Sequence, residues 1–211
     1  MRIFPGLVIS MLLAACAAES APTSVPTPTE APAAVPAATA TKEEQPAAIA
    51  TEEELALEQL DFKLTSSAYL QGDPIPASFS CDGENTSPRL TWTNPPTGTE
   101  SFALIFDDPD APGGTWVHWV LFNLPAEARS LPANVPPDST LANGAVHGSN
   151  SWKSIGYGGP CPPSGEHRYF MKLYALDSAL DLEVGATKEE LLDAMEDHIV
   201  GLTELMGTYS R

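Results

Sequence analysis

Two almost wholly apolar segments constrain the fold of this chain more than any other feature. They are "SFALIF" (101–106) and "WVHWVLFNL" (116–124), separated by the polar stretch "DDPDAPGGT". A strand with one exposed face alternates apolar and polar residues, whereas these segments are apolar on both faces of the pleat. We therefore expect two central strands of a sheet that is covered on both sides, joined through the polar turn.

The rest of the region 61–211 has a similar strand-and-turn pattern. Thr187 and Glu190 form a capping-box signature before a stripe of Leu191, Met195 and Ile199, which predicts one helix lying on the sheet. The spacing of the remaining runs predicts an all-β sandwich. These runs are "FKLTSSAYL", "PIPASFS", "RLTWT", "AVHGSNSW", "HRYFMKLYAL" and a last strand "LTELMGTYSR".

The first residues have the order of a secretory signal. Arg2 precedes an apolar run from Ile3 to Leu13, and small residues lead to Cys16. The stretch "LAAC" resembles the lipobox of bacterial lipoproteins, in which the cysteine receives lipid and becomes the mature N-terminus. We therefore expect a signal peptide over 1–15, lipidation of Cys16 and an extracytoplasmic, membrane-anchored protein of the cell envelope. The alternative is an ordinary cleaved signal.

A composition change divides the remaining chain. Residues 16–60 are rich in Ala, Pro, Thr and Glu and contain no aromatic residue, so they predict a disordered tether. Residues 61–211 have the size of one domain with one core. The chain carries a net charge of −18, and its domain has no basic cluster, which argues against a nucleic-acid partner.

The domain contains Cys81 and Cys161. In an exported protein such a pair is compatible with a disulfide, and the alternative is two buried free thiols.

Polar residues gather where the predicted strands begin or end. Asp108 leaves the first apolar segment near His118 of the second, and alternation would place His118 on one face with Val120 and Phe122. His167 and Tyr169 share a face at the start of a later strand. Two histidines, a tyrosine hydroxyl and backbone donors suit a phosphate or carboxylate group, and two histidines with an aspartate also suit a metal ion. The spacing leaves both alternatives open.

Other polar residues have simpler interpretations. We expect Asp107 to cap a strand end, His147 to face solvent, and His198 to pack near the helix C-terminus. The chain has no phosphate-binding glycine loop, no G-x-S-x-G elbow and no helical H-E-x-x-H pair, which argues against the corresponding hydrolases. The tryptophans are expected in the core or in a pocket wall: Trp92, Trp116, Trp119 and Trp152.

Several motifs resemble one known family. "DPDAP", "WVHWV" and "GPCPPSGEHRY" resemble the phosphatidylethanolamine-binding protein (PEBP) family, and "SFSCDGENTSPRLTW" resembles its bacterial Raf-kinase-inhibitor-like branch. The resemblance implies a Greek-key-like β-sandwich with a small pocket for an anion, typically a phosphate or phosphoryl head group, and no metal or cofactor. By motif position, the ligand-binding residues would be Asp108, His118, His167 and Tyr169, with Asp110, Gly159 and Pro162 shaping the rim.

One departure limits what is carried over. The charged insertion that eukaryotic members have after "DPDAP" is reduced here to "GGT", so the kinase-regulating role of those relatives does not transfer. Three hypotheses of function remain. The first is a binding protein for a small anionic or phosphorylated ligand without catalysis, the second is an inhibitor of an extracytoplasmic enzyme such as a protease, and the third is a phosphoesterase.

Overall fold

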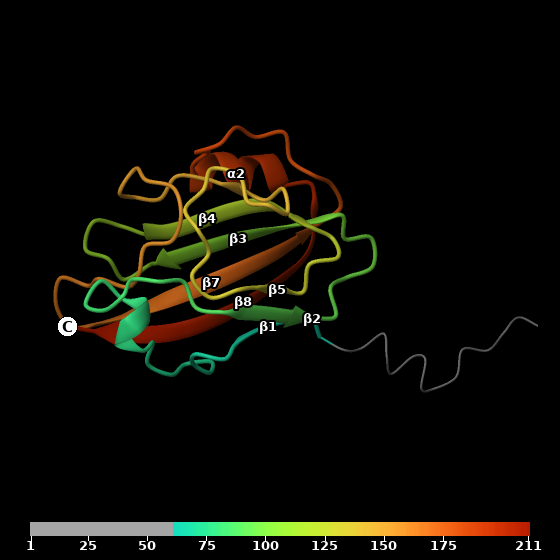
Figure 1. The fold of residues 1–211 in the computed structure, drawn as a ribbon. Helices are drawn as coiled ribbons and strands as arrows, with labels where there is room; N and C mark the ends of the chain where they lie inside the picture. Colours follow the sequence, from blue (N-terminus) through green and yellow to red (C-terminus); the bar gives the residue numbers. More distant parts are fainter. Residues whose placement is uncertain (1–60) are drawn as a thin grey trace, which may run out of the picture. The chain divides into compact units, whose positions relative to one another are not determined.

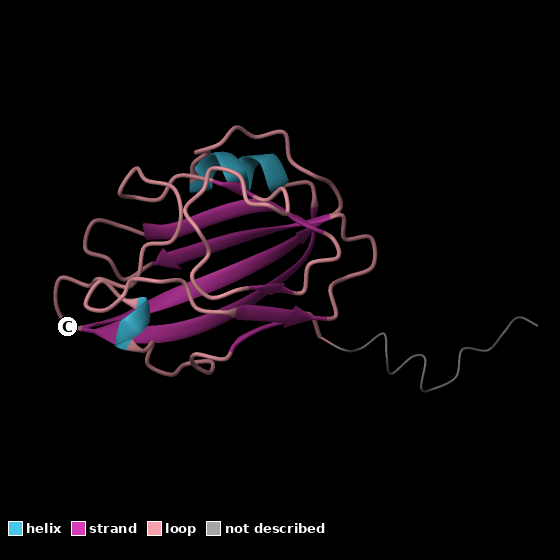
Figure 2. Cartoon of the chain, viewed as in Figure 1, coloured by secondary structure: helices cyan, strands magenta, loops and turns pink. Residues whose placement is uncertain are grey.

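The structure, a computed structural model, describes residues 61–211, and these form two β-sheets and one α-helix (Figure 1; Figure 2). The predicted signal peptide, Cys16 and the tether lie outside the described residues. No helix in the described part is long and apolar enough to cross a membrane. The expected all-β sandwich with one packed helix is confirmed.

The larger sheet has five antiparallel strands in the order β6-β4-β3-β7-β8. The two apolar segments form its neighbouring inner strands β3 and β4, as predicted, and every residue of β3 is buried. The strands span Ser101–Asp108 (β3), Trp116–Pro125 (β4), Val146–His147 (β6), Glu166–Leu176 (β7) and Ile199–Ser210 (β8).

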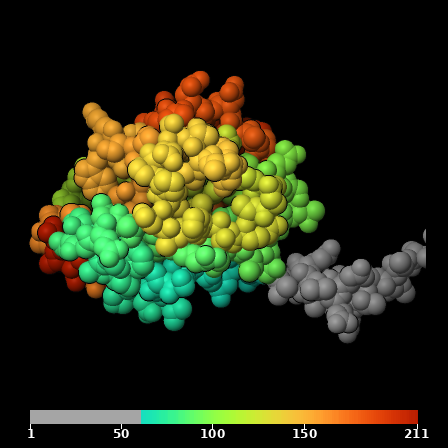
Figure 3. All heavy atoms as spheres, in the orientation of Figure 1, coloured from blue at the N-terminus to red at the C-terminus, as the bar shows by residue number. Residues whose placement is uncertain are grey.

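The smaller sheet covers one face of the larger one. It consists of β1 (Lys63–Ser66), β2 (Leu90–Thr93) and β5 (Ser130–Leu131), in the order β1-β2-β5. Side chains of both sheets form the main core, in which Trp92 meets Phe102 edge-on at a centroid distance of 5.5 Å. The chain following β4, coloured yellow, lies over this face (Figure 1; Figure 3). We call this side of the five-stranded sheet the site face.

Helix α2 (Lys188–Met195) covers the opposite side, which we call the helix face. The predicted capping box is present: the Thr187 hydroxyl accepts from the Glu190 amide, and the Glu190 carboxylate accepts from the Thr187 amide. Leu191 and Met195 are fully buried against β3 and β4. The helix ends before Ile199, which is exposed in β8, so the predicted stripe is one residue too long.

One predicted strand is wrong, and another is shorter than predicted. In "PIPASFS", Ala77–Phe79 form a 3-10 helix instead, since two prolines remove the backbone donors that a sheet ladder requires. In "AVHGSNSW", only Val146–His147 pair as a strand, and the following residues form a turn around Asn150. Sequence alternation did not reveal this turn.

Candidate functional site

A β-bulge at His118 determines which side chains reach the site face. Phe106 pairs with Trp119 and Asp107 pairs with Val117, so His118 is an extra residue in β4 without a partner in β3. The bulge turns His118 onto the site face beside Trp119, while Val117 and Val120 face the helix. The prediction that His118 shares a face with Val120 and Phe122 is therefore wrong.

The ring of His118 is held by the loop before β7. Its Nδ1 lies 2.8 Å from the carbonyl oxygen of Gly158, and the Gly158 amide donates to the His118 carbonyl at 2.9 Å. The side chain is 2% exposed and packs edge-on against Tyr169 and Trp152, with centroid distances of 5.3 and 5.1 Å. Burial lowers the pKa of His118, against smaller opposing effects of the Gly158 carbonyl and Asp108.

Asp108 interacts with His167, although we expected it beside His118. The Nδ1 atom of His167 donates to Oδ2 of Asp108 at 2.7 Å, and both side chains are buried. The other oxygen of Asp108 accepts from the Asp110 amide at 2.8 Å, which fixes the turn after β3. The carboxylate therefore has a defined partner on each oxygen.

Asp110 lies outside this buried pair. Its carboxylate makes two hydrogen bonds to the Arg168 guanidinium, at 2.9 and 2.7 Å, and accepts from the Arg168 amide. These bonds lower the pKa of Asp110 to about 2. Asp110 thus joins the "DPDAP" turn to the start of β7 at the surface.

Tyr169 lies beneath the two histidines. Its ring is fully buried and stacks on His167 with a centroid distance of 6.5 Å. The hydroxyl has no hydrogen-bond partner among the described residues. Burial, followed by the nearby Asp108 carboxylate, raises the pKa of Tyr169, so this hydroxyl keeps its proton and remains a donor.

A surface cavity of about 560 Å³ opens above these residues. Asp108 and His118 line it, whereas His167 and Tyr169 do not and support it from behind. Trp116 and Trp152 form an exposed, edge-on pair in its wall. Tryptophans were expected in such a position. The remaining lining comes mainly from the turn after β3: Ala111, Pro112, Gly113, Gly114 and Thr115, with Ser151, Cys161 and Pro163 from the loop before β7.

A second cavity of about 400 Å³ lies on the other side of Trp152 and Cys161. Gly159, expected at the rim, lines this second cavity, and its amide donates to the Asn85 side chain at 2.7 Å. A Cβ on Gly159 would collide with the Phe79 carbonyl, so the close approach of the two loops requires glycine. Pro162, also expected at the rim, is buried and lines neither cavity.

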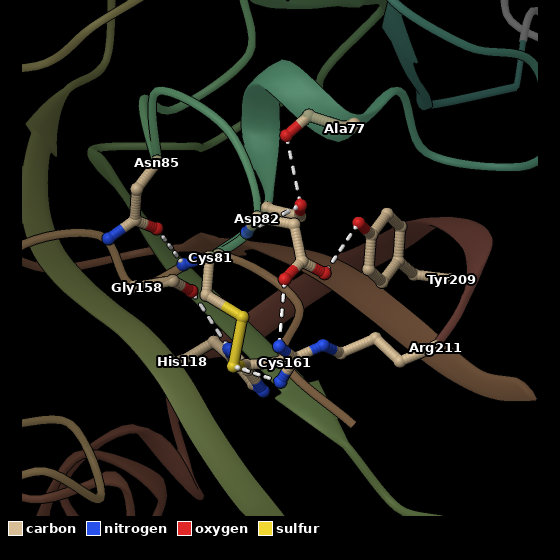
Figure 4. Close-up of a disulfide and its surroundings, with 11 residues drawn as sticks. Ala77, Cys81, Asp82, Asn85, His118, Gly158, Cys161, Tyr209 and Arg211 are labelled. Atoms are coloured by element: carbon tan, nitrogen blue, oxygen red, sulfur yellow. Dashed lines mark hydrogen bonds and ion pairs between the residues drawn. A yellow bond between two sulfur atoms is a disulfide. The ribbon is translucent and has the colours of Figure 1, made fainter. Parts of the chain in front are cut away.

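Cys81 and Cys161 form a disulfide, with an S–S distance of 2.06 Å (Figure 4). Cys161 lines both cavities. The C-terminal end of β8 reinforces this connection, because Tyr209 and Arg211 both bind the Asp82 carboxylate next to Cys81. The disulfide therefore fixes the loop that carries Gly158, the partner of His118.

Two simpler expectations need correction. Asp107 does not cap a strand end: it is fully buried on the helix face, where its carboxylate binds the ammonium groups of Lys172 and Lys188. His147 does not face solvent but is buried, with Nδ1 2.6 Å from the Asp138 carbonyl. His198 lies just past the C-terminal end of α2, as expected: its amide donates to the Met195 carbonyl, and its side chain, 44% exposed, binds the Asp177 carboxylate at 2.8 Å.

Some residues of the site region were not found by sequence reasoning. The Gly158 carbonyl holds His118, Ser151 holds the β4 backbone, and Arg168 holds Asp110. Gly158 and Ser151 lie outside the quoted motifs, and Arg168 lies within "GPCPPSGEHRY" but was given no role. Within residues 61–211, no group of three or more His, Cys, Asp or Glu side chains is arranged to hold a metal ion.

The sequence and the fold of this chain have counterparts among known proteins. The family model described as phosphatidylethanolamine-binding protein matches residues 65–210. A protein named UPF0098 from Methanothermobacter thermautotrophicus is 51% identical over 148 residues, which are 70% of this chain and 98% of that protein. One from Chlamydia muridarum is 45% identical over 158 residues, 71% of this chain and 99% of the relative.

Two crystal structures share the fold. A PEBP homologue from Chlamydia trachomatis aligns with a TM-score of 0.66 at 42% identity, covering 71% of this chain and 97% of its own. The E. coli protein YBCL, described as a member of the mammalian PEBP family, aligns with a TM-score of 0.68 at 34% identity, covering 72% and 99%. The chain belongs to the phosphatidylethanolamine-binding protein family.

Proposed function

We propose that this protein is a binding protein of the bacterial Raf-kinase-inhibitor-like branch that holds a small anion, a phosphate or phosphoryl head group, in the cavity above Asp108 and His118. The observation that carries the proposal is the arrangement at this cavity: His118 is held in one orientation by Gly158, and Asp108 is held by His167. Such fixed polar groups in an apolar wall are typical of small-ligand sites.

The tyrosine and the turn complete the proposed site. Tyr169 supports the two histidines from behind the cavity, and Asp110 with Arg168 fixes the turn at the rim. Gly159 and Pro162 act through the conformation of the loop before β7. The lining hydroxyls of Thr115 and Ser151 have no hydrogen bond to His118 or Asp108, which favours binding over a phosphoesterase reaction.

Isothermal titration calorimetry tests this function. We expect the 61–211 domain to bind inorganic phosphate or phosphoethanolamine, and His118→Ala to abolish the heat signal. His198→Ala, which changes an exposed histidine on another part of the surface, is the matched control and should bind normally. Absence of binding to phosphate, phosphoethanolamine and nucleotides at millimolar concentration would refute the proposal.

We also propose that the domain is displayed outside the cytoplasmic membrane through lipid on Cys16. The sequence order of Arg2, the apolar run and "LAAC" supports this, as does the long Ala/Pro/Thr/Glu segment between Cys16 and the domain. Mass spectrometry of the mature protein from membranes should show an N-terminal acylated cysteine. A Cys16→Ser variant should be released into the soluble envelope fraction, and unmodified Cys16 in the mature protein would contradict the proposal.

A second candidate is inhibition of an extracytoplasmic enzyme such as a protease. The exposed pair Trp116 and Trp152 favours it, since exposed tryptophans are enriched where proteins bind one another. Trp152→Ala should then weaken retention of an envelope protease on the immobilised domain. Equal retention by the variant and the unaltered domain would remove this candidate.

A further inference from the structure

The hydrogen bond of His118 fixes which of its nitrogens carries a proton. The Gly158 carbonyl oxygen can only accept, and it lies 2.8 Å from Nδ1, so Nδ1 is the protonated nitrogen. Burial, the dominant influence, lowers the pKa of the ring below its ordinary value, so the ring is neutral near pH 7. In this neutral tautomer, Nε2 has a lone pair and no proton.

The unprotonated nitrogen faces the cavity. Nε2 of His118 has no hydrogen-bond partner among the described residues and, unlike Nε2 of His147, it is not sealed from solvent. Since His118 lines the cavity, this nitrogen is presented to a ligand as a hydrogen-bond acceptor.

The groups around His118 do not change the acceptor character of its Nε2 atom. Asp108 of β3 faces the same cavity and is a second acceptor, while His167 of β7 directs its Nδ1 proton to Asp108. Tyr169 of β7 and Trp152 of the loop before β7 contact the ring without charge, and Asp107 lies on the opposite face of the sheet. None of the residues lining this cavity is lysine or arginine.

A fully deprotonated anion does not match such a wall, because it too can only accept hydrogen bonds. An oxyanion that retains one proton can donate it to Nε2 and place its remaining oxygens toward the hydroxyls of Thr115 and Ser151, which also line the cavity. We propose, resting on the oxyanion site proposed above, that the cavity selects an oxyanion that brings its own proton, namely singly protonated phosphate or a phosphomonoester, over sulfate and phosphodiesters.

Three ligands distinguish the effect of the ligand's charge from the effect of its proton. Near pH 6 about half of methyl phosphate carries one negative charge and a hydroxyl, dimethyl phosphate carries one negative charge without a hydroxyl, and sulfate has no proton. By calorimetry at pH 6, methyl phosphate should bind about tenfold to a hundredfold more tightly than the other two, the cost of a missing hydrogen bond at a buried polar group. Equal affinity of methyl and dimethyl phosphate would overturn the inference.

The pH provides a second measurement on the unaltered protein. The second pKa of a phosphomonoester is about 6, so its protonated fraction falls from about one half at pH 6 to about one hundredth at pH 8. Methyl phosphate affinity should fall on the order of tenfold or more, and calorimetry in two buffers of different ionisation enthalpy at pH 7 should show net proton uptake. Binding without proton uptake would contradict the inference.

A variant assigns the selectivity to His118. In His118→Gln the side-chain amide can turn its NH₂ toward the ligand, so the ratio of methyl phosphate to sulfate affinity should approach one, whereas His198→Gln should leave the ratio unchanged. If His118→Gln does not fold, the proton-uptake measurement decides. Sulfate that binds with proton uptake would show that His118 itself becomes protonated, which refutes the inference but leaves the oxyanion site. Failure of all three ligands to bind the unaltered protein would instead refute the site itself.

Discussion

Asp107 and Asp108 are neighbours in β3, both are buried, and they serve opposite faces of the same sheet. Asp107 binds two lysine ammonium groups on the helix face, whereas Asp108 binds an imidazole on the site face. A lysine stays charged through the usual pH range, while an imidazole changes protonation and presents a second nitrogen. Because side chains alternate between the two faces of β3, Asp107 serves stability and Asp108 serves ligand chemistry.

The helix-face carboxylate should have the largest effect on stability. Asp107→Asn leaves Lys172 and Lys188 beside a neutral amide, and removing one partner of a buried ion pair typically costs about 3–5 kcal/mol. Urea denaturation should show this loss in the free energy of unfolding, while the folded variant still binds phosphate. A loss no larger than that of Asp108→Asn would contradict the assignment of Asp107 to stability.

The site face is held by the disulfide between Cys81 and Cys161, whereas the helix face is held by the ion pairs of Asp107. The disulfide closes a loop with a sequence separation of 80 residues, and replacing it in Cys81→Ser/Cys161→Ser should cost about 2–4 kcal/mol. Because the freed loop carries Gly158, we also expect phosphate affinity to fall, an effect that Asp107→Asn should lack. Urea denaturation and calorimetry on both variants test this, and unchanged affinity in the double variant would separate the disulfide from the site.

Asp108→Asn should change the ligand chemistry more than the stability. Asparagine keeps an acceptor for His167 but loses the charge, so we expect a stability loss of about 1–2 kcal/mol. Without the negative charge, the cavity should tolerate sulfate better, and the ratio of methyl phosphate to sulfate affinity should fall. Calorimetry with both ligands measures this ratio. A larger loss of stability than in Asp107→Asn would reverse the comparison.

The sequence predicted the sheet better than the environment of its polar residues. Apolar runs on both pleat faces correctly predicted β3 and β4 as inner strands, and the capping box predicted α2. Period-two alternation failed at His118, because a bulge adds one residue and leaves no mark in the composition of the strand.

Partners distant in sequence were also beyond reach. Asp107 appeared to be a strand cap because Lys172 and Lys188, which bind it, come from a strand and a helix late in the chain. His147 appeared solvent-facing because its neighbours are small and polar, yet it packs against Trp119 with a centroid distance of 6.1 Å. Local sequence contains no signal for such contacts, which arise only when the sheet is assembled.

The two faces should also differ in how acid changes the free energy of unfolding, and we expect this effect to be the smallest. Burial lowers the pKa of both His118 and His147 below the ordinary 6.5, so near pH 6 the unfolded chain binds more protons than the folded domain. This contribution to stability is complete above pH 6.5 and is lost as the pH falls below it. Both of these histidines lie on the site face, where His118 contacts Phe106 and His147 contacts Trp119.

Urea denaturation between pH 7.5 and 5 measures this contribution. We expect the free energy of unfolding to decrease toward pH 5 and the decrease to become shallower in His147→Gln, whose glutamine does not titrate. An unchanged slope in His147→Gln would mean that its burial does not disfavour protonation, and the acid response would then have to come from His118 on the same face.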